Sequence, residues 1–148
     1  MENAIQIVEK NVLELENYFP GNNFDVLLSN PPYFKFHHED FLNHNKLKQI
    51  ARHEVLIDLE SLIRIASILL KTKGRFYLVH IPNRLDEIIV FAHKYHFGIK
   101  KVQFIHSKME ESPIIVLVCL VKNGKFGCIV KPPISINGLE TYQNLFKN

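Results

Sequence analysis

The clearest pattern in the chain is a helical repeat of apolar residues. Between residues 54 and 71, leucine, isoleucine and alanine recur at steps of three and four, which places them on one face of a helix. Gly74 follows as a stop signal. A second helix is predicted over residues 84–95, opened by Pro82-Asn83. The apolar stripe of the longer helix is typical of core packing.

Shorter apolar runs between and beside these helices predict strands. Phe24–Ser29 is apolar except for Asp25, which is typical of a buried parallel strand. Other runs predict strands at residues 5–9, 75–81, 101–106 and 114–122, a helical turn at 12–19 and a chain reversal at Asn123-Gly124. The link at 109–113 is too short for a parallel crossover, so we expect the last two long strands to be antiparallel, beside the strand at 75–81. This alternation predicts an α/β fold in a single domain over residues 1–148.

Composition and charge narrow the class only slightly. The 148 residues are 47% hydrophobic and 22% charged, as in globular proteins. A net charge of +3 permits a nucleic-acid partner without requiring one. There is no apolar run long enough for a bilayer, and the first four residues lack the pattern of a signal peptide. Cys119 and Cys128 are too few for a disulfide framework, which predicts a cytoplasmic protein with Cys119 in the core.

Asn30-Pro31-Pro32-Tyr33 directly follows the predicted strand Phe24–Ser29. The prolines lack the N–H groups of a strand ladder, so the strand must end there. Ligands of open α/β sheets bind beyond the carboxyl ends of strands. The motif is therefore placed where a ligand would bind, although a rigid turn with no chemical role has the same sequence requirements.

These residue types suit methyl transfer to the exocyclic amine of adenine. That amine is a weak nucleophile, and two acceptors for its hydrogens favour a pyramidal nitrogen with an available lone pair. The Asn30 side-chain oxygen and the Pro31 carbonyl are candidate acceptors, held in place by the prolines. The Tyr33 ring offers a face on which the base can stack. Other planar amines, in DNA or on a protein glutamine, would suit the same motif.

The run Phe24–Ser29 with the motif and Phe34 resembles the corresponding run of class I amino-methyltransferases. Further matches are Ala51-Arg52-His53-Glu54, Gly74-Arg75-Phe76, Pro82-Asn83-Arg84-Leu85 and Lys131-Pro132-Pro133-Ile134. Together they resemble the bacterial valine-tRNA adenine-N6 methyltransferases over nearly the whole chain. The resemblance implies S-adenosyl-L-methionine as cofactor and tRNA as substrate. It also implies a Rossmann-like methyltransferase sheet, mostly parallel, with an antiparallel C-terminal strand pair.

The resemblance also implies roles for individual residues. Asn30, Pro31, Pro32 and Tyr33 would be catalytic, and Asn11 and Asn30 would contact the cofactor. RNA contacts are expected from the aromatic and basic residues around the motif, namely Phe34, Lys35, Arg52 and His53, with Lys46 and Lys48 nearby. An ordinary solvated face is the equal alternative for the basic residues. Histidines 37, 38 and 44 with Glu39 and Asp40 match no zinc spacing, so no metal is expected, and a solvated loop over the substrate is favoured.

One expected feature of such enzymes has no counterpart in this sequence. None of its six glycines forms the Gly-rich cofactor loop between a strand and a helix. The chain is therefore expected to be the C-terminal portion of a methyltransferase domain, with a sheet that is incomplete towards the N-terminus. Two further strands would lie between the predicted strands at 5–9 and 24–29. A complementing N-terminal segment or a homo-oligomer would complete the sheet. The alternative is that the chain is a non-enzymatic remnant that binds RNA or a partner chain.

The absence of this loop predicts that the 148-residue chain by itself binds S-adenosyl-L-methionine weakly or not at all. Isothermal titration calorimetry on the isolated chain tests this. A micromolar dissociation constant would contradict it.

Overall fold

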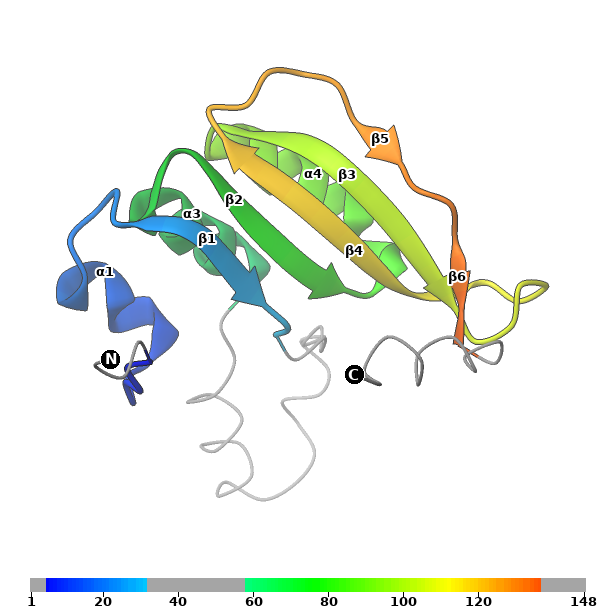
Figure 1. The fold of residues 1–148 in the computed structure, drawn as a ribbon, viewed down its shortest axis with the longest axis horizontal. Helices are drawn as coiled ribbons and strands as arrows, with labels where there is room; N and C mark the ends of the chain where they lie inside the picture. Colours follow the sequence, from blue (N-terminus) through cyan, green and yellow to red (C-terminus); the bar gives the residue numbers. More distant parts are fainter. Residues whose placement is uncertain (1–4, 32–57, 137–148) are drawn as a thin grey trace, which may run out of the picture.

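The computed structural model describes residues 5–31 and 58–136, and in these ranges it is a mixed α/β structure (Figure 1). The described elements, in chain order, are η1 (Val12–Glu14), α1 (Leu15–Tyr18), β1 (Phe24–Ser29), α3 (Leu59–Leu69), β2 (Leu70–His80), η3 (Pro82–Arg84), α4 (Leu85–Lys94), β3 (Phe97–His106), β4 (Pro113–Lys122), β5 (Ile129–Val130) and β6 (Ile134–Ser135). No helix in this part of the chain is long and apolar enough to cross a membrane.

The strands form one sheet in the order β1-β2-β4-β3-β5, with β6 also paired to β3. β1 and β2 are parallel, whereas β4 is antiparallel to both β2 and β3. Because β5 and β6 are parallel to β3, β4 is the one described strand that runs opposite to the others. The expected sheet, mostly parallel with an antiparallel C-terminal pair beside β2, is confirmed.

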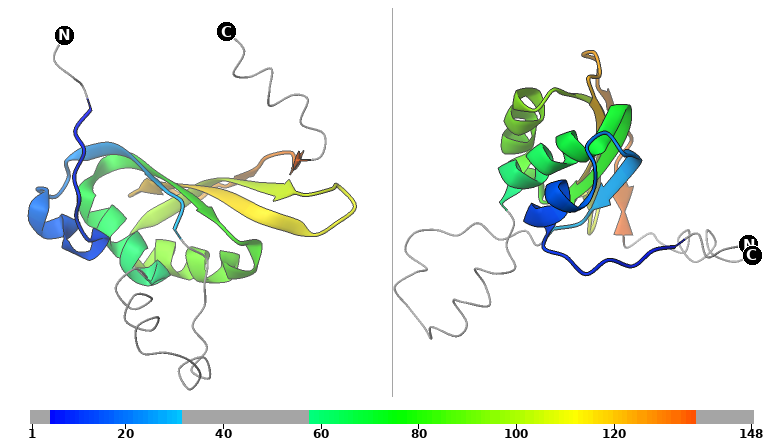
Figure 2. Two further views of the ribbon diagram at one scale, coloured as in Figure 1. Left: turned by 90° about the horizontal axis from the view of Figure 1, so that it is seen from below. Right: turned by 90° about the vertical axis from the view of Figure 1, so that its left-hand side faces the viewer.

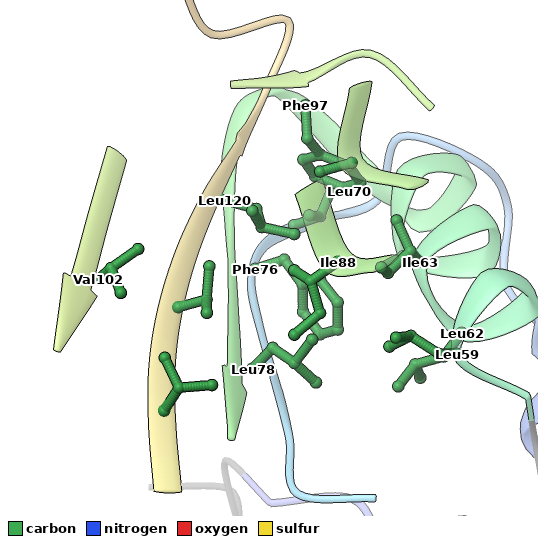
Figure 3. Close-up of a cluster of buried hydrophobic side chains, with 14 residues drawn as sticks. Leu59, Leu62, Ile63, Leu70, Phe76, Leu78, Ile88, Phe97, Val102 and Leu120 are labelled. Carbon is green, nitrogen blue, oxygen red and sulfur yellow. The ribbon is translucent and has the colours of Figure 1, made fainter. Parts of the chain in front are cut away.

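Both long helices lie on the same face of this sheet (Figure 2). Burial along β2 alternates from Gly74 to His80, as it must when one face is covered and the other is not. Phe76 and Leu78 point from β2 into the core, where they meet Ile63 of α3 and Ile88 of α4 (Figure 3). The remaining buried members of this core are Leu59, Leu62, Ala66, Leu70, Ala92, Phe97, Val102, Val116, Val118 and Leu120.

Local interactions explain where α3 begins and ends. The carboxylate of Asp58 accepts a hydrogen bond from the Ser61 N–H at 2.9 Å, which caps the first turn. The helix ends at Leu69 rather than at the predicted Lys71, because the chain turns directly into β2. Gly74 instead sits inside β2, where a Cβ atom would lie 2.8 Å from the Lys71 carbonyl oxygen. The lack of a side chain at Gly74 therefore lets the backbone pack closely where the β1–β2 ladder shifts its register, between Phe24 and Val26.

Two expectations about the N-terminal strands were wrong. Residues 5–9 form no strand, and Ile5 and Ile7 are more than 80% exposed, because no described strand lies beside them to complete their hydrogen bonds. β1 exists and is parallel, but it is the edge strand of the sheet and is not buried. Val26 and Leu28 are 47% and 79% exposed. Among the described strands, β1 thus borders the sheet and pairs on one side only, with β2.

The core packing predicts a contrast between two apolar residues of α4. Ile88 is fully buried, so Ile88→Ala should lower the free energy of unfolding by about 2–5 kcal/mol. Val90 is 61% exposed on the same helix, and Val90→Ala should change it by less than about 0.5 kcal/mol. Urea denaturation of both variants tests this, and equal effects would contradict the described core.

Candidate active site at the carboxyl edge of the sheet

The motif begins where β1 ends. The parallel register pairs Ser29 with Leu78, so Asn30-Pro31 leaves the sheet at the same edge as the end of β2. Asn30 is exposed, whereas Pro31 is buried. The buried Pro31 ring anchors the turn against the protein directly after the exposed residue Asn30. Proline also fixes its own φ, which limits movement of the carbonyl that follows.

The structure describes only part of the predicted site. Asn30 and Pro31 lie in it, but Pro32, Tyr33, Phe34, Lys35, Arg52 and His53 lie outside the described residues. The same is true of Lys46, Lys48 and the histidine-rich stretch at 37–44. Their predicted roles therefore stay predictions.

Asn11, the other predicted cofactor contact, lies directly ahead of η1. Its side-chain oxygen accepts a hydrogen bond from the Leu13 N–H at 3.0 Å and so caps that short helix. A bidentate ion pair between Glu16 and Arg64, at 2.8 and 3.0 Å, then ties α1 to α3. Because the oxygen is used as a cap, a contact between Asn11 and a cofactor would use the amide nitrogen.

His80 is a residue of this edge that the sequence patterns did not single out. It ends β2 and, at 1% exposure, is the one buried polar side chain among the described residues. Its Nδ1 accepts a hydrogen bond from the Ile81 N–H at 2.9 Å, so the proton of the neutral ring is on Nε2. The sequence offered one sign of this residue, a histidine shortly before Pro82-Asn83. Its burial could not be predicted, because the burial depends on the helices that cover it.

The electrostatic setting keeps this imidazole neutral. Burial lowers the pKa of His80 below its usual value of 6.5, and the positive charge of Arg84 lowers it further. Arg84 is itself held by Glu87, with an Nη2–Oε2 distance of 2.8 Å. The end of β2 thus holds a buried, uncharged imidazole two residues after Leu78, the register partner of Ser29.

The face of the sheet that carries no described helix is also part of the site's surroundings. It contains an apolar hollow of about 320 Å³ between β1 and β3. Leu28, Tyr77, Val79 and Leu117 line it, and Lys101 and Lys131 lie at its border. Cys119 is buried there, as the sequence predicted for this residue, and both cysteines are free thiols.

Comparison with known proteins gives these features a context. No family model matches the chain. A protein of Pedobacter heparinus named tRNA1(Val) (adenine(37)-N6)-methyltransferase is 32% identical over 111 residues, which are 75% of this chain and 46% of that protein. A protein of the same name from Bacteroides thetaiotaomicron is 25% identical over 146 residues, which are 99% of this chain and 59% of that protein. The chain is a relative of these methyltransferases. It spans about half of their length, and the resemblance stated above is confirmed.

Solved structures agree on the fold. The predicted O-methyltransferase Atu636 from Agrobacterium tumefaciens superposes with a TM-score of 0.61 at 23% identity, covering 83% of this chain and 48% of that one. A putative DNA modification methylase of Thermus thermophilus, TTHA0409, in complex with S-adenosyl-L-methionine, gives a TM-score of 0.55 at 18% identity and covers 93% and 64%. The sheet is therefore of the methyltransferase type, as the sequence predicted.

The setting of His80 predicts a pH dependence of stability. Because its folded-state pKa is lowered, the folded protein gains stability from the neutral ring above about pH 6.5 and loses it as the pH falls towards the folded pKa. The free energy of unfolding should decline between pH 7 and 5 with a slope of at most about 1.4 kcal/mol per pH unit, since one proton is taken up. Urea denaturation at stepwise pH measures this.

His80→Asn should abolish that slope, whereas His93→Asn, which removes an exposed histidine, should retain it. A slope that survives His80→Asn would show that another group causes it.

Proposed function

We propose that this chain is the substrate-facing portion of an S-adenosyl-L-methionine-dependent adenine-N6 methyltransferase that acts on RNA, specifically tRNA. The observation that carries the proposal is Asn30-Pro31 at the carboxyl end of a parallel strand in a methyltransferase-type sheet. The names of the curated relatives support the substrate. The free thiols of Cys119 and Cys128 support a reducing cytoplasm as its location.

The proposed chemistry assigns each residue of the motif one task. The exposed Asn30 amide accepts one hydrogen of the adenine amine, and the carbonyl of the buried Pro31 accepts the other. Both acceptors are fixed before substrate binds, so little reorganisation is needed as the nitrogen becomes pyramidal. Asn30 is neutral and is no base, so the amine loses its proton to water after the carbon–nitrogen bond has formed. The cofactor supplies the methyl group.

Residues around the motif are proposed to hold the base and the RNA. Tyr33 and Pro32 stack against the adenine, and Phe34 extends the aromatic surface. Lys35, Arg52 and His53 contact the phosphate backbone next to the modified nucleotide. These tasks are proposed from the sequence and the resemblance, since the residues lie outside the described part of the chain.

The described residues fit one side of a cofactor site. Asn30 and the amide nitrogen of Asn11 are proposed to contact S-adenosyl-L-methionine. A further segment, on the same polypeptide or another, is proposed to supply the Gly-rich loop by adding a parallel strand to the open edge of β1. The exposure of Val26 and Leu28 supports this, because a strand and a covering helix would bury both. A second copy of the chain is the alternative partner.

A DNA amine or a protein glutamine amide is the alternative substrate, because each presents a planar nitrogen to the same two acceptors. A tRNA transcript, a DNA oligonucleotide of matched sequence and a glutamine peptide, assayed side by side, distinguish them. Methylation of the DNA or the peptide but not of the tRNA would overturn the proposed substrate.

The motif predicts the effect of substitutions in an enzyme completed by a cofactor-binding segment. Asn30→Ala removes one preorganised acceptor and should lower the single-turnover methylation rate about 10²- to 10³-fold, or about 2.7–4 kcal/mol. Cofactor affinity, measured separately, should change much less. Tyr33→Ala should weaken both RNA binding and rate, whereas Tyr33→Phe keeps the ring face and should be mild. Adenine methylation by Asn30→Ala at near the unmutated rate would reduce the motif to a turn.

A further inference from the structure

The opposite edge of the sheet, where β1, β2 and β3 begin and β4 ends, has an unusual backbone. We call it the amino edge; it is the upper-left side of the sheet in Figure 1. Every described residue with positive φ lies at or beside it: Asn22, Lys73, His96, Asn123 and Gly127. Left-handed backbone is costly for lysine and histidine, and it persists only where the surrounding contacts fix it.

Hydrogen bonds connect these turns into one rigid surface. The Asn123 N–H donates to the His96 carbonyl at 2.7 Å, and Lys73 Nζ donates to the Asn123 carbonyl at 3.0 Å. Lys122 Nζ donates to the Asn22 side-chain oxygen at 2.8 Å. The turn after β4 also lies directly against Gly98, where a Cβ atom would be 2.5 Å from the Gly124 carbonyl oxygen. Three separate chain reversals are therefore held in one fixed arrangement.

Three lysines of this surface donate hydrogen bonds to oxygens that carry no charge. Lys73 and Lys122 donate to neutral oxygens, and Lys100 donates to the carbonyls of Lys125 and Phe126. Lys125 is exposed. The ion pairs of the described residues use other lysines, such as Lys71 with Asp25. Among the described residues, four ammonium groups thus lie at one edge without a carboxylate partner, and three of them are fixed by the hydrogen bonds just given.

An aromatic side chain stands among these charges. Phe126 is 83% exposed, and its ring centroid lies 5.1 Å from that of His93. A hollow of about 280 Å³ adjoins it, lined by His93, His96, Phe97, Asn123, Lys125 and Phe126. Exposed rings beside lysines are the arrangement that binds single-stranded nucleic acid, since bases stack on the ring while ammonium groups contact phosphates.

We propose that the amino edge binds the backbone of the RNA substrate and that Phe126 stacks on one of its unpaired bases. This inference rests on the proposed function in taking RNA as the substrate. The seven residue steps from Lys73 to His80 span roughly 23 Å at about 3.3 Å each, so a ligand that reaches both edges is much larger than one nucleotide. A folded RNA meets that requirement, and its charge complements the surface.

Binding of a tRNA transcript to the 148-residue chain, measured by fluorescence anisotropy between about 50 and 200 mM salt, tests the proposal. Phe126→Ala should weaken binding about 5- to 140-fold with an unchanged salt dependence, because stacking releases no counterions. Lys125→Ala should reduce the slope of log affinity against log salt by about 0.7–0.9. Val90→Ala and Lys10→Ala, at exposed positions of the same kinds elsewhere, are the matched controls and should bind like the unmutated chain.

Thermal unfolding of each variant shows that it is folded. Absence of tRNA binding by the unmutated chain at the lowest salt, or equal binding by Phe126→Ala, Lys125→Ala and the controls, would overturn the proposal. If Phe126→Ala and Lys125→Ala lose binding to polyglutamate but keep tRNA binding, the surface serves an acidic protein partner instead. The Asn30→Ala assay remains separate: if methylation survives there while Phe126→Ala loses tRNA, methyl transfer by the motif fails and the RNA surface stands.

Discussion

The burial of one face of β2 beneath α3 and α4 is the interaction on which the rest of the structure depends. Phe76 and Leu78 share one buried cluster with Ile63 of α3 and Ile88 of α4, and this cluster fixes both helices to the sheet. β2 then provides the parallel ladder for β1 on one side and the antiparallel ladder for β4 on the other. Without this core, the strand that carries Asn30 would have no neighbour to set its position.

The same arrangement gives the two edges of the sheet different properties. The carboxyl edge holds the buried Pro31, the buried neutral His80 and the exposed residue Asn30, and these uncharged groups suit recognition of an uncharged base. At the amino edge, lysines donate to carbonyl oxygens rather than to carboxylates, which suits a phosphate backbone. In the two proposals taken together, contacts that choose the reacting atom are separate from contacts that provide affinity.

The sequence allowed most of the fold to be predicted. The spacing of apolar residues indicates which face of a helix or strand is buried, provided that the element packing against that face belongs to the same chain. α3, α4 and the strands β2, β3 and β4 were all found in this way. The strand predicted at residues 5–9 was wrong. The β-branched residues there suit a strand, but a strand needs a neighbouring strand, and none is described beside them. The burial expected for β1 failed because it requires cover on an edge that is open here.

The candidate site was predictable only where it is local. Asn30 and Pro31 stand out because consecutive prolines after a strand are informative in themselves. His80 and Phe126 are single residues whose meaning depends on burial or exposure, which is a property of the assembled fold. The left-handed backbone at Lys73 and His96 is likewise imposed by contacts between distant turns, and neither residue type indicates it.

The strand order also has a consequence for how the protein folds. β3 and β4 are joined by a short connection that pairs His106 with Pro113, whereas the β1–β2 ladder pairs Leu27 with Phe76. Closing the longer loop costs about 1.7 kcal/mol more, at about 0.6 kcal/mol per doubling of loop length. Loop closure therefore favours the hairpin as an early structure and β1 as a late addition. β1 also has a ladder on one side only, so we expect it to open locally more readily than β2. Such opening would move Asn30 while the core between β2 and the helices stayed folded.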